Sequence, residues 1–305
     1  MKILITGASG MVGRNLVEHY FISTQNLLTP SSKELDLCNE YEVDKYIEMH
    51  RPDCIIHSAG RVGGIQANIE NPYEFLHQNL KIGINIVNSA YKHNVKQMIN
   101  LGSSCMYPSG FERPISESDM LTAPLETTNE GYALAKITVA KAVEYIAGTG
   151  SLYRYTTLIP CNLYGKYDSF DSSKSHLIPA IIVKISNAIK TGEPVIIWGD
   201  GSARREFMYV EDFADFVGYI LQNDIITSVY LNVGLGYDYT IKEYYQAVAK
   251  VLNYKGEFQF DTSKPVGMKR KIVNIEQLNR TEWRAKYSLE DGIQKIVDYY
   301  INEEA

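Results

Sequence analysis

A strand-like segment of the chain ends in residues that can do chemistry. Ser103 and Cys105 follow the apolar run 97–101, and Tyr132 and Lys136 lie downstream in a Tyr-x-x-x-Lys spacing. A strand that ends in serines and is followed by this spacing is typical of enzymes that use a nicotinamide cofactor to reduce a carbonyl group. The thiol two residues after Ser103 is unusual at such a site and indicates a second reaction in the same pocket.

The spacing of Tyr132 and Lys136 places both side chains on one face of a predicted helix. A free tyrosine has a pKa of about 10, and a neighbouring ammonium group lowers that pKa. We expect the Tyr132 hydroxyl to pass a proton to a carbonyl oxygen as hydride reaches the carbon, with Ser103 bonded to the same oxygen. Lys136 would also hold the nicotinamide ribose. Because the chain has 23 tyrosines, the interpretation depends on the order of glycine loop, Ser103 and Tyr132 rather than on the pair alone.

A glycine-rich loop follows the first predicted strand, 2–6. Gly7, Gly10 and Gly13 lie in this loop, which opens a predicted helix at Met11. Glycines permit the tight turn and let backbone N–H groups reach a pyrophosphate at the positive end of the helix. The spacing is a weak signal alone, but its position directly after the first strand predicts a dinucleotide cofactor.

The end of the second predicted strand indicates which dinucleotide binds. Enzymes that prefer NAD usually have a carboxylate here that bonds the ribose hydroxyls. This chain has Thr29-Pro30-Ser31-Ser32-Lys33 instead, and we expect Asp36, farther on, to lie near the adenine. The hydroxyls and the Lys33 ammonium favour NADP, although a merely solvated Lys33 would also explain the sequence.

One of the six histidines is a candidate partner for the thiol. His176 lies in Ser175-His176-Leu177-Ile178-Pro179, at the start of the second half. A thiol and an imidazole on opposite faces of a sugar ring can remove and return a proton at carbons next to a ketone, which inverts them. A free cysteine has a pKa near about 8.5, so Cys105 would need nearby positive charge or a proton acceptor. Alone, such a cysteine is more often a small buried residue, and such a histidine a structural donor.

Strands and helices alternate through the first half of the chain. Apolar runs at 2–6, 27–29, 54–57, 97–101 and 155–160 are separated by predicted helices at 11–20, 40–50, 71–90 and 129–146. This alternation predicts an α/β fold with a Rossmann-type, doubly wound parallel sheet. We expect residues 1–162 to form the NADP-binding domain, completed by segments near 207–235. Residues 163–305 would form mainly a smaller, mixed substrate-binding domain, with helices at 177–190, 213–222, 241–252 and 288–303 and strands at 194–198, 229–233 and 258–260.

Composition argues against several classes of protein. The net charge of −6 gives no reason to expect nucleic acid, whose binders carry a basic patch. The four cysteines are widely spaced without a Cys-x-x-Cys pair, which argues against a zinc site or a disulfide framework and fits a reducing cytosol. No segment approaches the ~20 apolar residues of a membrane span. We expect a cytoplasmic protein that binds no metal, membrane or nucleic acid.

Short motifs, several of them peculiar to one enzyme family, run in order along most of the chain. They are Gly10-Met11-Val12-Gly13, Val62-Gly63-Gly64-Ile65, Gln78-Asn79, Leu101-Gly102-Ser103-Ser104-Cys105, Thr128-Asn129-Glu130, Asn162-Leu163-Tyr164-Gly165, Ser175-His176 with Ile178-Pro179, Trp198-Gly199 with Gly201, and Arg205-Glu206-Phe207. On these motifs the chain resembles the GDP-L-fucose synthases. These are GDP-4-keto-6-deoxy-mannose 3,5-epimerase/4-reductases of the extended short-chain dehydrogenase/reductase superfamily.

The resemblance implies an NADPH-dependent C4 reductase of a GDP-4-keto-6-deoxy sugar, with C3/C5 epimerisation, in nucleotide-sugar biosynthesis for surface glycans. Cys105 and His176 would be the epimerisation pair, and Ser103, Tyr132 and Lys136 the reductase trio. NADP(H) would contact Gly7, Ser9, Gly10, Met11, Val12, Gly13, Ser32, Lys33, Asp36, Leu37, Ala59, Gly60, Arg61, Leu101, Gly102, Tyr132, Lys136, Pro160, Asn162, Leu163 and His176. The GDP-linked keto-sugar would contact Ser104, Asn162, Lys184, Trp198, Arg205 and Lys271, with Arg205 toward the phosphates.

Three departures from the family pattern bear on the identity of the sugar. Lys184 stands where an arginine is usual, which keeps the charge but loses the planar fork. Val266 replaces an aspartate in a Lys-Pro-Asp-Gly motif, and Cys161 replaces a common threonine. A reductase that acts on a GDP-4-keto-6-deoxy-heptose without epimerisation therefore remains an alternative.

Two other functions also remain as alternatives. A nucleotide-sugar dehydratase or 4-epimerase would share the fold, but dehydratases often carry Asp-Glu where this chain has Cys105-Met106. A non-catalytic NADP-binding protein would typically have lost the tyrosine or the lysine, and both are present. We also expect a homodimer, because helices 71–90 and 129–146 correspond to the dimer interface of similar enzymes; burial within a monomer would equally explain their apolar faces.

Overall fold

A six-stranded parallel sheet forms the centre of the protein. The computed structural model describes all residues except 151, 172–174, 226, 265–267 and 305. The strand order is β10-β5-β4-β3-β1-β2, and every neighbouring pair is parallel. The strands are β1 (Lys2–Thr6), β2 (Asn26–Leu28), β3 (Cys54–His57), β4 (Gln97–Leu101), β5 (Arg154–Pro160) and β10 (Tyr230–Val233). The expected doubly wound parallel sheet is confirmed.

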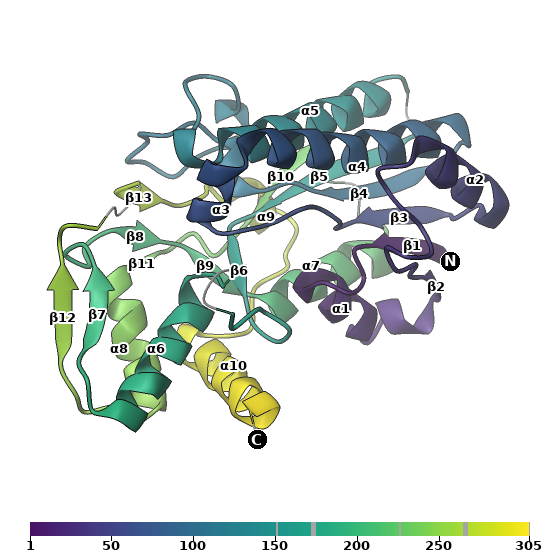
Figure 1. Ribbon diagram of the computed structural model, residues 1–305. Coiled ribbons are helices and arrows are strands. Elements are labelled where there is room, and N and C mark those ends of the chain that lie inside the picture. The colour runs from purple at the N-terminus through teal and green to yellow at the C-terminus, as the bar shows by residue number, and fades with distance from the viewer. Residues whose placement is uncertain (151, 172–174, 226, 265–267, 305) are drawn as a thin grey trace.

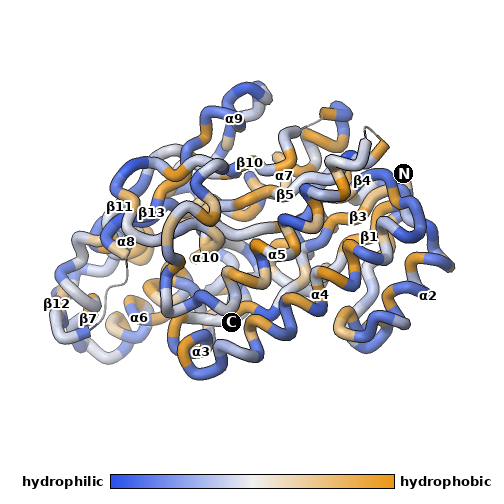
Figure 2. Tube along the Cα trace, turned by 90° about the horizontal axis from the view of Figure 1, so that it is seen from above, coloured by the Kyte–Doolittle hydropathy of each residue, from blue (hydrophilic) through white to orange (hydrophobic). Residues whose placement is uncertain are grey.

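Helices cover both faces of the sheet (Figure 1). One layer consists of α2 (Glu40–His50), α4 (Pro72–Lys92) and α5 (Glu130–Ala147), and the other of α1 (Met11–Glu18) and α7 (Val210–Gln222). Successive strand residues point to opposite faces, so Leu4 joins the core under the first layer while Ile3 and Ile5 join the core on the other side. Figure 2 shows α4 and α5 side by side along the sheet.

The C-terminal part builds a second core beside the sheet. Helices α6 (Leu177–Thr191), α8 (Ile241–Val251) and α10 (Leu289–Glu304) pack around β7 (Val195–Trp198), which pairs in parallel with β12 (Phe258–Asp261). A small sheet in the order β11-β8-β13 lies between the two parts of the molecule. Its strands are β11 (Tyr239–Thr240), β8 (Arg204–Arg205) and β13 (Arg270–Lys271), and β6 (Asn162–Tyr164) pairs separately with β9 (Phe207–Tyr209).

Most predicted elements agree with the structure to within about two residues, and the misses are local. Helix α7 begins at Val210 rather than Phe213, because Glu211 and Asp212 occupy its first turn, where carboxylates favour a helix. The predictions omitted β6, β8, β9, β11, β13 and the short helices α3 (Ile65–Glu70) and α9 (Glu276–Asn279). Elements of two to six residues contain too little hydrophobic periodicity to be recognised.

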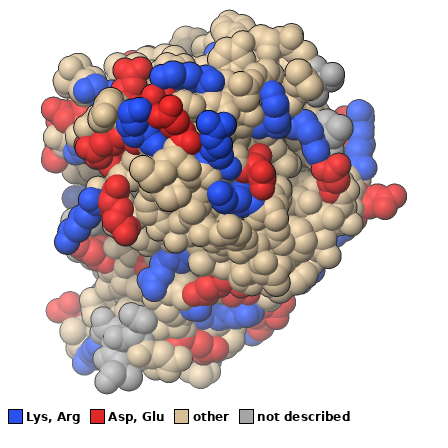
Figure 3. All heavy atoms as spheres, turned by 90° about the vertical axis from the view of Figure 1, so that its right-hand side faces the viewer, with Lys and Arg blue, Asp and Glu red and all other residues tan. Residues whose placement is uncertain are grey.

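The surface carries both signs of charge. On the face shown in Figure 3, acidic and basic side chains are interspersed and no single sign dominates. Within the part of the chain that the structure describes, none of the helices combines the length and the apolar character that crossing a membrane requires.

Candidate active site

The glycine loop brings helix α1 into direct contact with the sheet. Gly7 has a positive φ of 72°, and a Cβ added there would lie 2.8 Å from the backbone of Ala59. A Cβ on Gly13 would lie 2.1 Å from the carbonyl oxygen of Gly7. These two close approaches require glycine, and they aim the N-terminus of α1 at the carboxyl edge of the strands, as a pyrophosphate site requires.

A buried asparagine holds the loop after β3. The Oδ1 atom of Asn79 accepts a hydrogen bond from the Arg61 backbone N–H at 2.9 Å, and its Nδ2 donates to the Arg61 carbonyl at 3.0 Å. A Cβ on Gly60 would lie 3.0 Å from Asn79 Oδ1 and 3.6 Å from Lys136 Nζ. The loop Ala59–Arg61, predicted to contact the cofactor, therefore lies against Lys136.

The loop after β2 contains a carboxylate that the sequence interpretation did not consider. Ser32 and Lys33 lie exposed in a turn, which leaves both able to meet a 2′-phosphate. Glu34 follows them, but its Oε2 accepts hydrogen bonds from the backbone N–H and hydroxyl of Ser31, each at 2.8 Å. Glu34 is thus engaged within its own turn, and the preference for NADP argued from this loop stands.

The reductase trio comes together at the end of β4. Ser103 lies within reach of the Tyr132 side chain, whose pKa it lowers. Lys136 is buried, and its Nζ donates to the carbonyl of Leu101 at 3.0 Å and lies 5.9 Å from the centre of the Tyr132 ring. A strand end and one face of α5 therefore position all three side chains, as the spacing predicted.

The electrostatics of the trio differ from the expectation. Burial raises the pKa of Tyr132, and the neighbouring Cys105 raises it further, against a lowering by Ser103. Burial also lowers the pKa of Lys136 to about 8. The expected net lowering of the Tyr132 pKa is therefore wrong for this arrangement, because burial is the largest influence and raises it. Tyr132 is held as the phenol, which is the form that can donate a proton.

Two side chains from distant parts of the chain meet at the Cys105 thiol. The Nδ2 atom of Asn129 lies 3.2 Å from Cys105 Sγ, and the Nζ atom of Lys271 lies 3.6 Å from it. The backbone N–H of Cys105 donates to Ser103 Oγ at 3.2 Å, which joins the thiol to the reductase trio. The positive charge that Cys105 was expected to need is supplied by Lys271, which was expected to contact the GDP-linked sugar.

His176 lies exposed at the N-cap of α6. Burial raises the pKa of Asp168 to about 6, and a Coulomb interaction with His176 opposes that increase. One Asp168 oxygen is buried without a hydrogen-bond partner among the described residues. Asp168 was not singled out from the sequence, and no spacing signal pointed to it.

Two expected sugar-nucleotide contacts meet on the C-terminal part. Lys184 Nζ lies 5.5 Å from the centre of the Trp198 ring and donates to the Ile196 carbonyl at 3.3 Å. Trp198 is 53% exposed, so a flat apolar group can cover its ring. By contrast, Ser104 is buried in a short 3₁₀ helix and keeps little surface for a substrate contact. Val266, which replaces the expected aspartate, lies outside the described residues.

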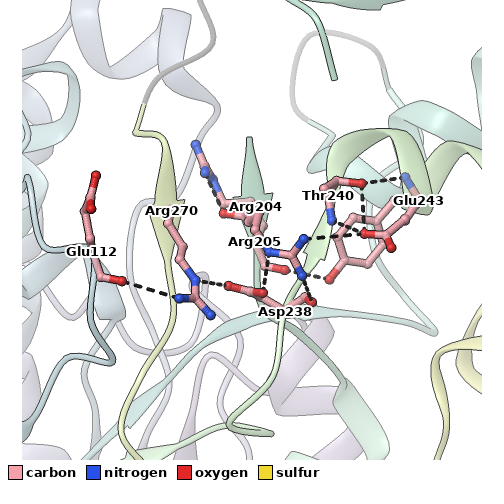
Figure 4. A network of polar contacts seen from close by, with 8 residues as sticks. Glu112, Arg204, Arg205, Asp238, Thr240, Glu243 and Arg270 are labelled. Carbon is pink, nitrogen blue, oxygen red and sulfur yellow. Dashed lines mark hydrogen bonds and ion pairs between the residues drawn. The ribbon is translucent and has the colours of Figure 1, made fainter. Parts of the chain in front are cut away.

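A charged network holds the small sheet in place (Figure 4). Asp238 is buried, and its two oxygens accept hydrogen bonds from Arg204 Nε at 2.7 Å and from Arg270 Nε at 2.5 Å. Although burial raises it, these hydrogen bonds lower the net pKa of Asp238. In Figure 4 the Arg205 guanidinium is turned away from Asp238. Alternation along β8 thus separates the arginine that holds the sheet from the one expected to meet substrate.

A second buried carboxylate supports the same region. Glu206 accepts hydrogen bonds from the backbone N–H groups of Leu235, Gly236 and Val273, and burial raises its pKa to about 7. The carbonyl of Glu206 also accepts a hydrogen bond from Asn162 Nδ2 at 2.8 Å. The Arg205-Glu206-Phe207 motif therefore has a structural middle residue beside the arginine that is expected to meet substrate.

Replacing Asp238 by asparagine should loosen this sheet. Arg204 and Arg270 would lose their shared carboxylate, and because both guanidinium groups are more than a third exposed, we expect a loss of only about 1–3 kcal/mol of unfolding free energy. The Michaelis constant for the sugar nucleotide should also rise, since Arg205 and Lys271 lie on these strands. Urea denaturation and steady-state kinetics measure the two effects. Glu243→Gln is the matched control, because Glu243 is exposed and lies 3.9 Å from Arg204; equal losses in both variants would contradict the role of Asp238.

Among the described residues, no three His, Cys, Asp or Glu side chains gather closely enough to hold a metal ion. We expect phosphate recognition from the helix terminus, the arginines and the lysines.

A family model, sequence relatives and solved structures are similar to this chain over most of its length. The model of the NAD dependent epimerase/dehydratase family matches residues 3–234. A GDP-L-colitose synthase from Yersinia pseudotuberculosis is 53% identical over 304 residues, which cover 99% of both chains. A GDP-L-fucose synthase from Azorhizobium caulinodans is 47% identical over 301 residues, 98% of this chain and 96% of the relative. The solved structure of a GDP-D-glycero-L-gluco-heptose synthase from Campylobacter jejuni, in the presence of NADPH, is similar with a TM-score of 0.88, 28% identity and 98% coverage of both chains.

Proposed function

We propose a function from the family to which this chain belongs, the GDP-L-fucose synthase group of the NAD dependent epimerase/dehydratase family. The protein is an NADP-dependent oxidoreductase that reduces C4 of a GDP-4-keto-6-deoxy sugar. The observation that carries the proposal is the meeting of Ser103, Tyr132 and Lys136 at the end of β4, with Cys105 beside them. A dehydratase is disfavoured, because a thiol stands where dehydratases often have an acid/base pair of carboxylates, and net NADPH oxidation would separate the reductase from a 4-epimerase.

The residues of the cofactor site fit NADPH. Gly7 and Gly13 let the N-terminus of α1 approach the sheet closely, because a Cβ at either position would collide with backbone atoms. Lys33 lies exposed in the loop after β2. Bound NADPH supplies the hydride for C4. Lys136 lies between the glycine of the Ala59–Arg61 loop and the Leu101 carbonyl, where it can hold the nicotinamide ribose.

The protein side of the reduction is proton transfer. Tyr132, held as the phenol, donates its proton to the C4 oxygen as that oxygen gains charge. Ser103 hydrogen-bonds the same oxygen, and the nearby Lys136 ammonium stabilises the tyrosinate that remains. The raised pKa of Tyr132 therefore suits the reductive direction, in which the residue must begin protonated.

We propose that the same pocket also epimerises the sugar. Cys105 would remove a proton from a carbon next to the C4 ketone, and His176 would return one from the other face. The charged and amide groups at the Cys105 thiol support the first of these roles. A reductase that acts on a heptose without epimerisation stays a second candidate, since the heptose synthase from Campylobacter jejuni shares the fold over 98% of the chain.

The sequence relatives suggest two products. The relatives at 53% and 47% identity are a GDP-L-colitose synthase and a GDP-L-fucose synthase. A reaction of the fucose type would invert both C3 and C5, and inversion at fewer carbons would indicate another product. Either product would be a GDP-linked deoxy sugar for surface glycans, and the pattern of inversion separates them.

Product analysis in heavy water tests the proposal directly. The enzyme is incubated with NADPH and each candidate GDP-4-keto sugar in D₂O, and the product is analysed by NMR. We expect NADPH oxidation, a hydroxyl at C4 and deuterium at C5, with deuterium also at C3 for the fucose type. The Cys105→Ser variant should still reduce a ketone that is already epimerised, but it should incorporate no deuterium at the ring carbons. Reduction with full retention of ring protons would refute epimerisation, and no NADPH oxidation with any candidate would refute the function.

We also propose that the two parts of the chain bind different molecules. Residues 1–162, with β10 completing the sheet, would bind the cofactor, and residues 163–305 would mainly bind substrate.

We further propose a homodimer. Four large, exposed side chains lie on two neighbouring helices: Leu134 and Tyr145 on α5, and Tyr73 and Tyr91 on α4. A homodimer formed through α4 and α5 would cover side chains of this kind.

A further inference from the structure

The Cys105 thiol lies among polar partners rather than in an apolar core. Asn129 and Lys271 approach its sulfur at 3.2 and 3.6 Å from two elements that are distant in the sequence. Cys54 and Cys161, by contrast, are buried, and burial raises the pKa of both thiols. Cys105 is therefore the cysteine whose surroundings can support a negative charge.

The small sheet explains how Lys271 reaches the thiol. Strands β8 and β13 are parallel, with Arg270 opposite Arg204 and Lys271 opposite Arg205. Both residues of the first pair bind Asp238. Since neighbouring residues of a strand point to opposite faces, anchoring Arg270 to Asp238 directs Lys271 to the other face, where Cys105 lies.

Asn129 is placed by the helix that carries the reductase trio. It is the N-cap residue of α5, three residues before Tyr132. Its Nδ2 donates toward the sulfur, while its Oδ1 is buried without a hydrogen-bond partner among the described residues. A buried acceptor without a partner is costly, so this atom suits a hydroxyl donated by a bound sugar.

We propose that Lys271 and Asn129 are positioning residues that hold the Cys105 sulfur and stabilise the negative charge on it when it acts as the base of the epimerisation. This inference rests on the proposed function. In the step, the thiolate takes a proton from the carbon next to the ketone, an S–H bond forms as the C–H bond breaks, and the electron pair moves onto the ketone oxygen as an enolate. The reverse step, with a proton from the opposite face, restores the ketone and inverts the carbon.

The charged partner is Lys271 rather than another group at the site. Tyr132 also faces the thiol from α5, but its raised pKa keeps it neutral at neutral pH. Lys136 directs its ammonium at the Leu101 carbonyl. An ammonium close to sulfur favours the thiolate by Coulomb attraction, and an amide donor adds a hydrogen bond to the same charge.

Thiol alkylation tests the inference without requiring turnover. The rate of iodoacetamide modification of Cys105 is followed by peptide mass mapping from about pH 6 to about pH 9 in a Cys38→Ser background, since Cys38 is the other cysteine that is not buried. We expect Lys271→Met to slow alkylation at neutral pH by about tenfold or more and to shift the profile to higher pH. Lys271→Arg should largely restore the rate, and Asn129→Ala should give a smaller decrease.

A neighbouring lysine provides the matched control. Lys269 lies two residues away, its side chain is 86% exposed, and it pairs with Glu112. Lys269→Met should therefore alkylate like the parent, and thermal melting would verify that each variant is folded. Unchanged alkylation in folded Lys271→Met, or an equal decrease in Lys269→Met, would overturn the inference. If the product gains no deuterium in heavy water but Lys271→Met still slows alkylation, the arrangement around the Cys105 sulfur stands and only its use in epimerisation is refuted.

Discussion

Replacing Tyr132 by phenylalanine is expected to abolish NADPH oxidation while leaving NADPH binding largely intact. The change removes one oxygen, the proposed proton donor to the C4 oxygen, and keeps the ring that lies near Lys136. Loss of a general acid typically lowers the rate by about 10²–10⁴-fold, and here Ser103 also lies within reach of the same side chain. We expect an effect in kcat of at least about 10³-fold, with the Kd for NADPH changed less than about threefold.

Absorbance at the NADPH band measures turnover, and fluorescence titration measures binding. Tyr145→Phe is the matched control, because Tyr145 lies on the same helix and is 70% exposed. It should leave kcat unchanged. Turnover of Tyr132→Phe at the parental rate would refute the assignment of the general acid, and parallel loss of binding and turnover would indicate a structural defect instead.

Replacing Gly13 by alanine is expected to disrupt the cofactor site and the first helix together. Helix propensity alone predicts that alanine stabilises an interior helix position by about 1 kcal/mol. The structure predicts the opposite sign, because the new Cβ would lie 2.1 Å from the Gly7 carbonyl oxygen and 2.6 Å from the Ala8 Cα. Both neighbours are backbone, so the helix itself must move. We expect the unfolding free energy to fall by about 1–3 kcal/mol and the affinity for NADPH to fall by about tenfold or more.

The matched control for this prediction is Gly10→Ala in the same loop. A Cβ on Gly10 would lie 3.5 Å from the Gly7 oxygen, which is ordinary van der Waals contact. Its unfolding free energy should change by less than about 1 kcal/mol, since Gly10 is an N-cap residue where alanine is only moderately unfavourable. Urea denaturation compares the two variants. A stabilised Gly13→Ala would show that the close approach in this loop does not limit stability.

The parallel sheet could be predicted because its strands are continuous apolar runs. Cys54–His57 and Gln97–Leu101 are buried along almost their whole length, and the predicted bounds of both match the structure. The two-residue strands of the small sheet could not be predicted in this way. Arg204-Arg205 and Arg270-Lys271 are wholly polar, and what makes them strands is a carboxylate, Asp238, that neither segment contains.

The sequence by itself determined the parallel α/β fold, and it predicted the cofactor loop and the candidate reductase trio, because these depend on local periodicity, short spacings and motifs. Only the tertiary structure decided the chemical state of the site. Lys271 reaches the thiol of Cys105 across 166 residues of chain, and no local pattern predicts such a contact. The direction of the Tyr132 pKa was likewise settled by burial, which depends on everything packed around the residue rather than on the lysine four positions away.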